Sequence, residues 1–220
     1  MKKKFISFIL SLIILLSTAN VVVAKTFVDT KNHWAKEYID TLSDYGFISG
    51  YEGNVFKPNS QITKAEFFTV VNNMANLKKT YTVTFSDVSP KDWYYNEVAK
   101  AIKSGYLVPT TGNLYPDRPI TREEAFYIFG YLYNFQEETS DFKNFSDSDD
   151  IKPEYRGYMA ALVKSGVVSG DNGKLNPKSP ITRAEFCAIA ANLIDKYGLP
   201  EEKVVIDSKI KFGSRNLYNW

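Results

Sequence analysis

Three positively charged residues, Lys64, Arg122 and Arg183, have a spacing that points to binding chemistry. Each follows a threonine inside a related hexapeptide, at residues 62–67, 120–125 and 181–186, and successive threonines are 58 and 61 residues apart. Guanidinium and ammonium groups bind carboxylates and phosphates. A cation that recurs with a period of about 60 residues therefore predicts a repeat protein with an anion site in each repeat.

The other residues of each hexapeptide predict the start of a helix. Thr63, Thr121 and Thr182 are each followed three residues later by a glutamate. This spacing is a capping box, in which the threonine side chain accepts a hydrogen bond from a free helix N–H and the glutamate reaches back to the threonine N–H. The threonine and the glutamate thus need no ligand to explain them.

The cation does need a further explanation. A positive charge in the first turn opposes the helix dipole and costs about 0.3–1 kcal/mol. A chance surface charge in each repeat is one alternative. The sharper hypothesis is an anion site, because a cation beside free N–H groups at a helix start can hold a carboxylate. On this hypothesis the cations do not support the fold, so Arg122→Ala and Arg183→Ala would weaken binding without unfolding the protein.

Two helical segments surround each loop. Apolar residues recur at helical spacing after each hexapeptide, and an earlier segment with its own apolar stripe ends at a glycine followed by an apolar residue, which is typical of a helix C-terminus. These glycines are Gly46, Gly105 and Gly166. The pattern predicts an all-α chain of three helix-loop-helix repeats. Two helices cannot bury such stripes alone, so the repeats must pack on one another.

The N-terminus predicts export. Residues 1–24 combine three lysines, an apolar run and a small-residue cleavage signal, as in a secretory signal peptide, and no membrane span is expected after cleavage. Removal of Lys2, Lys3 and Lys4 lowers the net charge from +2 to −1, which gives no reason to expect nucleic acid as a partner. We predict repeats at residues 25–80, 81–140 and 141–199 and a tail at 200–220.

Catalytic and metal-binding patterns are not recognised. Cys187 is expected to be a small core residue, and the single histidine, His33, cannot form a histidine metal site. The acidic run that begins at Asp147 lacks the spacing and the closing glutamate of a calcium loop. No pair of carboxylates stands out for hydrolysis. We therefore expect no enzyme activity, no metal and no cofactor.

The repeats resemble the S-layer homology (SLH) family, in its usual set of three. The resemblance covers residues 27–197, and it is carried by Phe-x-Asp openings, by His33-Trp34-Ala35, by the Gly-rich loop at 46–53 with Phe56-x-Pro58, and by the Ile-Thr-Arg-Ala-Glu-Phe hexapeptide. It implies a pseudo-threefold arrangement around a central helical bundle, with grooves between neighbouring repeats. Members hold exported proteins non-covalently on the bacterial cell wall, usually by binding a secondary cell wall polysaccharide with a pyruvate-ketal terminus.

The resemblance also implies which residues line the grooves. The basic residue of the Thr-Arg-Ala-Glu motif falls on the three cations, and a ketal carboxylate suits an arginine, which donates two parallel hydrogen bonds. Trp34 and Trp93 would offer ring faces to a sugar. The alternative role for both residues is packing in the core or at its rim. The candidate ligand-binding set is Lys64, Arg122, Arg183, Trp34, Trp93, Gly50, Gly170, Thr63, Thr121 and Thr182.

The three grooves are not expected to be equal. Repeat three has Glu154 where the others have tryptophan, and repeat two has Pro109 where the others have Gly50 and Gly170. Glycine permits close backbone approach to a ligand, whereas proline removes an N–H donor. Lys64 supplies only a point charge. Grooves that use these altered positions are expected to bind less well.

The sequence thus predicts a secreted module on the bacterial cell wall that binds an anionic glycan. An alternative is a structural component or adaptor of a surface layer, with surface-layer proteins as partners. A third is the truncated anchor of a longer surface enzyme.

Overall fold

The protein is described by a computed structural model at residues 26–138, 142 and 144–201. The predicted signal peptide and residues 202–220 of the predicted tail lie outside this part. The regular elements within it are helices, and extended pairing is limited to isolated bridges, so the all-α prediction is confirmed. The helices are α1 (Lys36–Asp44), α2 (Lys64–Met74), α3 (Tyr95–Ser104), α4 (Arg122–Leu132), the short 3-10 helix η1 (Ser148–Asp150), α5 (Pro153–Lys164) and α6 (Arg183–Tyr197).

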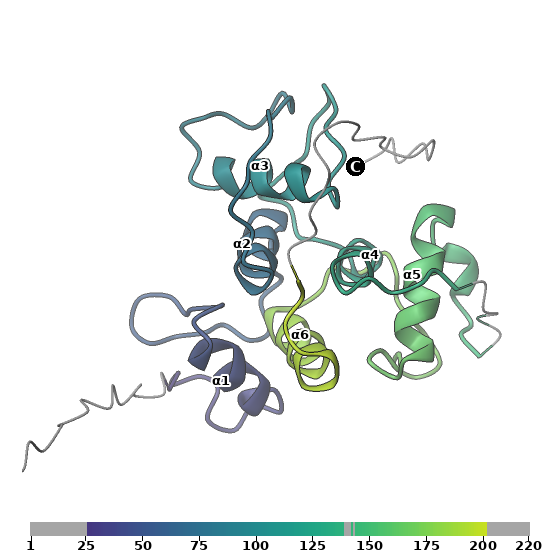
Figure 1. Ribbon diagram of the computed structural model, residues 1–220. Coiled ribbons are helices and arrows are strands. Elements are labelled where there is room, and N and C mark those ends of the chain that lie inside the picture. The colour runs from purple at the N-terminus through teal and green to yellow at the C-terminus, as the bar shows by residue number, and fades with distance from the viewer. Residues whose placement is uncertain (1–25, 139–141, 143, 202–220) are drawn as a thin grey trace, which may run out of the picture.

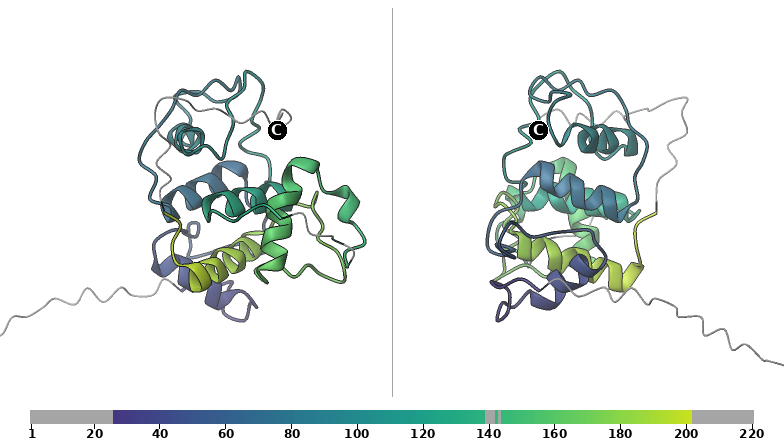
Figure 2. Two further views of the ribbon diagram at one scale, coloured as in Figure 1. Left: turned by 45° about the vertical axis from the view of Figure 1, so that its right-hand side comes forward. Right: turned by 90° about the vertical axis from the view of Figure 1, so that its left-hand side faces the viewer.

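The helices pack in pairs that cross the boundaries between repeats. The second helices α2, α4 and α6 lie side by side in the centre, and α1, α3 and α5 lie outside them (Figure 1). The contacts between helices join α3 to α2, α5 to α4 and α1 to α6. Two further views show the same arrangement (Figure 2). The first helix of each repeat therefore covers the second helix of another repeat.

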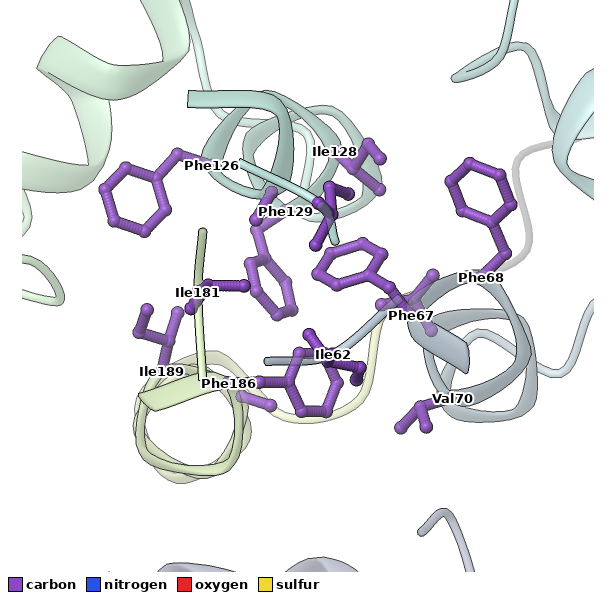
Figure 3. Packing of buried hydrophobic residues seen from close by; sticks show 14 of the residues in the cluster. Ile62, Phe67, Phe68, Val70, Phe126, Ile128, Phe129, Ile181, Phe186 and Ile189 are labelled. Carbon is purple, nitrogen blue, oxygen red and sulfur yellow. The ribbon is translucent and has the colours of Figure 1, made fainter. Parts of the chain in front are cut away.

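Three phenylalanines fill the centre of the bundle. Figure 3 shows Phe67, Phe129 and Phe186 pointing toward one another, and their ring centroids are 5.2–5.7 Å apart. Phe67 and Phe186 occupy the last position of their hexapeptides, where the second repeat has Ala125. Phe129 lies one turn further along α4, so a ring from the next turn fills the space that the smaller residue leaves.

A closed ring of backbone hydrogen bonds links the three hexapeptides. The N–H of Ile120 donates to the carbonyl of Ile62, that of Ile62 to Ile181, and that of Ile181 to Ile120, each at 3.1 Å. Because three bonds close the ring, each hexapeptide contacts both of the others. This cyclic order is what a pseudo-threefold arrangement requires, and the arrangement itself stays a prediction.

The aspartates of the Phe-x-Asp openings clamp the loops. The two carboxylate oxygens of Asp29 accept hydrogen bonds from the N–H groups of Phe56 and Lys57 at 2.8 and 2.7 Å. Asp87 and Asp147 make the same pair of bonds to their own loops. The carboxylate of Asp147 therefore has a structural role, and the described residues include no group of three or more metal-ligating side chains.

Candidate functional site

Each second helix begins against the loop of another repeat. We call these places the Lys64 junction, the Arg122 junction and the Arg183 junction, after the first residue of α2, α4 and α6. In each, the second N–H of the helix donates to a proline carbonyl of that loop. The bonds run from Ala65 to Pro116, from Glu123 to Pro177 and from Ala184 to Pro58, at 2.9–3.0 Å.

The capping boxes are confirmed in all three helices. Thr63, Thr121 and Thr182 accept from the N–H three residues later, and the glutamate there accepts from the threonine N–H at 2.8–2.9 Å. Each threonine hydroxyl also lies 2.9–3.2 Å from that glutamate's Oε2. These hydroxyls are engaged in building the helix start.

The backbone N–H groups at the helix starts are not free. In α2, those of Lys64 and Ala65 donate to loop carbonyls at 3.0 and 2.9 Å, and that of Glu66 donates to Thr63 Oγ1 at 3.2 Å. The same bonds occur in α4 and α6. The expectation that free N–H groups would help to hold an anion is therefore wrong. The side-chain cations remain as the anion-binding groups of the hypothesis.

Each cation faces the capping glutamate of another repeat. The Nζ of Lys64 lies 3.0 Å from Glu124 Oε1, and Nη1 of Arg122 lies 2.9 Å from Glu185 Oε1. The Nη1 of Arg183 lies 3.9 Å from Glu66 Oε1, beyond hydrogen-bond distance. Each glutamate thus caps its own helix with one oxygen and faces a neighbouring repeat's cation with the other. The cations help to join the repeats, which a chance surface charge would not do.

Arg183 is the most enclosed of the candidate site residues. Only 4% of it is exposed. Its Nε and Nη2 donate to the carbonyls of Phe56 and Ser49 at 3.0 and 2.8 Å, and its Cζ lies 4.4 and 4.9 Å from the centres of the Phe56 and Tyr51 rings. These bonds hold two loop carbonyls. The expectation that Arg183 could be removed without affecting the fold is therefore not met.

The two candidate tryptophans are on the surface. Trp34 and Trp93 are 61% and 63% exposed and lie two residues before α1 and α3 begin. The neighbouring His33 places Trp34 beside the Arg183 junction, because its Nε2 lies 3.1 Å from Oδ1 of the loop residue Asn59. Packing of the tryptophans in the core is excluded, and their rings are available to a ligand.

Packing in the loop explains why glycine stands at both candidate positions, Gly50 and Gly170. A Cβ on Gly50 would lie 2.4 Å from the Phe27 ring and 2.6 Å from the Val55 carbonyl, and one on Gly170 would meet Phe145 and the backbone in the same way. Gly170 also has a positive φ of 73°. Packing of the opening phenylalanine explains both glycines. The loops of repeats one and three each contain an isolated β-bridge, Tyr51 with Val55 and Asp171 with Lys174. In the second repeat Pro109 stands at the glycine position, and the described part of its loop contains no equivalent bridge.

Sequence reasoning missed Glu123. This residue is 1% exposed, and its carboxylate accepts hydrogen bonds from Lys178 Nζ at 2.8 Å and from the Lys152 N–H at 3.1 Å. The signal was present, because the equivalent residues, Ala65 and Ala184, are alanines in the other hexapeptides. Glu123 places a second cation, Lys178, at the Arg122 junction, so the three junctions differ in their charged residues.

The described chain is a helical three-repeat module whose junctions carry cations, and Trp34 is exposed beside the Arg183 junction. The S-layer homology domain model matches residues 26–68, 84–126 and 144–187. The chain therefore belongs to the S-layer homology family. The matched segments fall inside the three predicted repeats, and the boundaries between repeats remain a prediction.

Curated relatives include enzymes and surface-layer proteins. The chain is 36% identical over 180 residues to the amylopullulanase of Thermoanaerobacterium thermosulfurigenes, which covers 79% of the chain and 10% of that protein. It is 32% identical over 177 residues to exoglucanase XynX of Acetivibrio thermocellus, with 78% and 16% covered. It is 32% identical over 167 residues to the surface-layer 125 kDa protein of Lysinibacillus sphaericus, with 74% and 14% covered. The chain thus spans less than a fifth of the length of these relatives.

Family and relatives identify a bacterial protein associated with the cell surface or cell wall, and a module of the anchoring type. Within residues 26–138, 142 and 144–201, none of the helices has the length and apolarity needed to cross a membrane.

Proposed function

We propose that the protein binds an anionic secondary cell wall polysaccharide, with a pyruvate-ketal terminus, in grooves between its repeats. The observation that carries the proposal is the exposure of Trp34 beside the Arg183 junction, which also holds a cation. Trp93, its counterpart in the second repeat, is almost equally exposed. An exposed tryptophan ring offers a large flat apolar face, which suits the face of a sugar. A carboxylate on that sugar would have the cation as its partner.

The Arg183 junction is the best candidate of the three. It brings together Trp34, Gly50 and an arginine, whereas the Lys64 junction has Pro109 in its loop and the Arg122 junction has Glu154 in place of tryptophan. Among the described residues, the carboxylate that Nη1 of Arg183 faces is that of Glu66, and the 3.9 Å separation is beyond hydrogen-bond distance. A ligand carboxylate that entered beside Tyr51 would supply a closer partner.

The proposed protein is an anchor and not an enzyme. Reversible recognition needs the tryptophan and the cation and no bond-making group. The enzymes among the relatives suggest that the module can serve as the wall anchor of a longer catalytic chain. The surface-layer relatives favour the second candidate, a component of a surface layer that assembles with other copies.

Sedimentation with purified wall sacculi tests the proposal. The protein should sediment with sacculi that carry the secondary polysaccharide and remain in solution once acid extraction has removed that polymer. Trp34→Ala should reduce the bound fraction, and Tyr81→Ala, a change at another exposed aromatic residue, should not. Undiminished binding to extracted sacculi would exclude the polysaccharide as ligand, and assembly without wall would favour the surface-layer alternative.

A further inference from the structure

A groove lies between α1 and α6, and its lining residues include none of the candidate site residues. Its volume is about 340 Å³, and its walls include Glu37 and Tyr38 from α1, Tyr45 just after α1, and Asn192 and Asp195 from α6. Tyr45 is 53% exposed, and its ring stacks on Phe47 at 5.2 Å with an interplanar angle of 9°. The ring is therefore held in one orientation before any ligand arrives.

One position on the second helix explains why this groove is open. Ala191 of α6 lines the groove together with Tyr38 of α1. The equivalent residue of α4 is Gly130, where a Cβ would lie 2.6–2.8 Å from Tyr158, the residue equivalent to Tyr38. Glycine lets that tyrosine pack against the α4 backbone, and the methyl group of Ala191 prevents the same approach at α6.

The pair of α2 and α3 fills this space differently. Asn72 of α2 occupies the equivalent position and donates hydrogen bonds to the carbonyl and the carboxylate of Glu97 at 3.0 and 2.9 Å. Glu97 also pairs with Lys100 at 2.7 Å. A polar network thus occupies this position in one pair and a tyrosine packs against it in the other, whereas in the α1 and α6 pair it borders the groove.

The groove lining favours a neutral ligand with hydroxyl groups. The carboxylates of Glu37 and Asp195 and the amide of Asn192 are strong hydrogen-bond acceptors, and the residues that line the groove include no lysine, arginine or histidine. An anionic group would be repelled here, unlike at the junctions. The Tyr38 and Tyr45 rings supply flat apolar surface, and a few placed polar groups in an aromatic groove are typical of small-ligand sites.

We propose that this groove binds an uncharged sugar unit of the same wall polysaccharide, as a second subsite next to the Arg183 junction. This inference rests on the proposed function. The two sites are connected along α1, because the Trp34 and Tyr38 rings lie 6.4 Å apart in an edge-to-face arrangement. From Lys36 to Asp44 α1 rises by roughly 12 Å at 1.5 Å per residue, which separates the junction end of the helix from its groove end. One polymer can therefore place its charged terminus at the junction and an inner sugar in the groove.

The test uses calorimetric titration with wall polysaccharide before and after mild acid removal of its ketal-linked carboxylates. Tyr45→Ala should weaken binding of the intact polymer by about three- to tenfold, because it removes one aromatic contact. It should weaken residual binding of the acid-treated polymer by the same factor, and that residual binding should not depend on salt. Tyr81→Ala is the matched control, and thermal unfolding checks that each variant is folded.

Three results would overturn the inference. If Tyr45→Ala bound both polymers with wild-type affinity while Trp34→Ala bound them more weakly, the groove would be rejected as a sugar subsite and the proposed function would stand. Failure of the wild-type protein to bind either polymer would reject both. The groove would be assigned to a cationic partner if the protein bound a tetralysine peptide, Glu37→Gln abolished that binding, and Tyr45→Ala left the affinity for the polymer unchanged.

Discussion

The Nε of Arg183 donates a hydrogen bond to the carbonyl oxygen of Phe56 at 3.0 Å, across 127 residues of sequence. This contact fastens the last central helix, α6, to the loop of the first repeat. It closes the set of three, because α1 also packs on α6. A fourth repeat would need that face of α6 for its own first helix, following the pattern of α3 on α2 and α5 on α4.

The first prediction concerns the stability provided by Arg183. Arg183→Ala removes the donors to the carbonyls of Phe56 and Ser49. The Phe56 carbonyl is buried, and an orphaned buried acceptor costs about 1–3 kcal/mol, so we expect the free energy of unfolding to fall by about 1–3 kcal/mol. Urea unfolding followed by circular dichroism measures this change.

The matched control for Arg183 is Lys164→Ala. Lys164 also pairs with a glutamate, Glu138, at 2.9 Å, but its side chain is 64% exposed. Exposed pairs contribute about 0–1 kcal/mol, so this change should have little effect. Similar losses in the two variants would show that the loop carbonyls find other partners and that Arg183 does not close the fold.

The second prediction concerns Gly50. In Gly50→Ala the new Cβ would lie 2.4 Å from the Phe27 ring and 2.6 Å from the Val55 carbonyl. Since both neighbours must move, we expect a loss of about 1–3 kcal/mol in the free energy of unfolding. Gly112→Ala is the control, because a Cβ there meets its nearest atom, Thr110 Oγ1, at 3.6 Å. A melting temperature unchanged by Gly50→Ala would contradict the packing explanation.

Local sequence signals predicted the helix ends correctly. The capping boxes at Thr63, Thr121 and Thr182 formed as expected. The predicted stops at Gly46, Gly105 and Gly166 all have positive φ. These features depend on residues within one turn of each other, so the amino-acid order is sufficient to predict them.

The partners of the cations could not be predicted in the same way. Arg122 meets Glu185, 63 residues away, only because the loop of the third repeat lies against the start of α4. That contact depends on how the repeats pack, which the local pattern does not contain. The exposure of Trp34 depends likewise on the turn that precedes α1.

The third prediction is a pH dependence that involves Asp29. Desolvation alone would raise the pKa of its carboxyl, but hydrogen bonds from the Phe56 and Lys57 N–H groups outweigh it, so the pKa lies below its usual value. A group with a lowered folded pKa stabilises the fold above its unfolded pKa of about 3.9, and this contribution is lost as the pH falls through the folded pKa.

Asp29→Asn tests this pH dependence. The difference in unfolding free energy between the wild type and this variant should be largest at pH 7 and should shrink at about pH 3 and below. Asp44→Asn, at an exposed position at the end of α1, serves as the control. A difference for Asp29 that stays constant from pH 7 to about pH 2 would mean that ionisation of its carboxylate does not hold the loop.

The last prediction ranks the two tryptophans in wall binding. Trp34 and Trp93 are almost equally exposed, so either change to alanine should leave the melting temperature within about 1–2 °C of the wild type. The repeats that carry them differ, because the junction beside Trp34 has Arg183 and Gly50, whereas Trp93 belongs to the repeat whose loop contains Pro109 and contacts the start of α2 at Lys64. An arginine can hold a carboxylate through two hydrogen bonds, which a lysine cannot match. Trp34→Ala should therefore reduce sedimentation with native sacculi more than Trp93→Ala does. The opposite order would move the main binding site to the Lys64 junction.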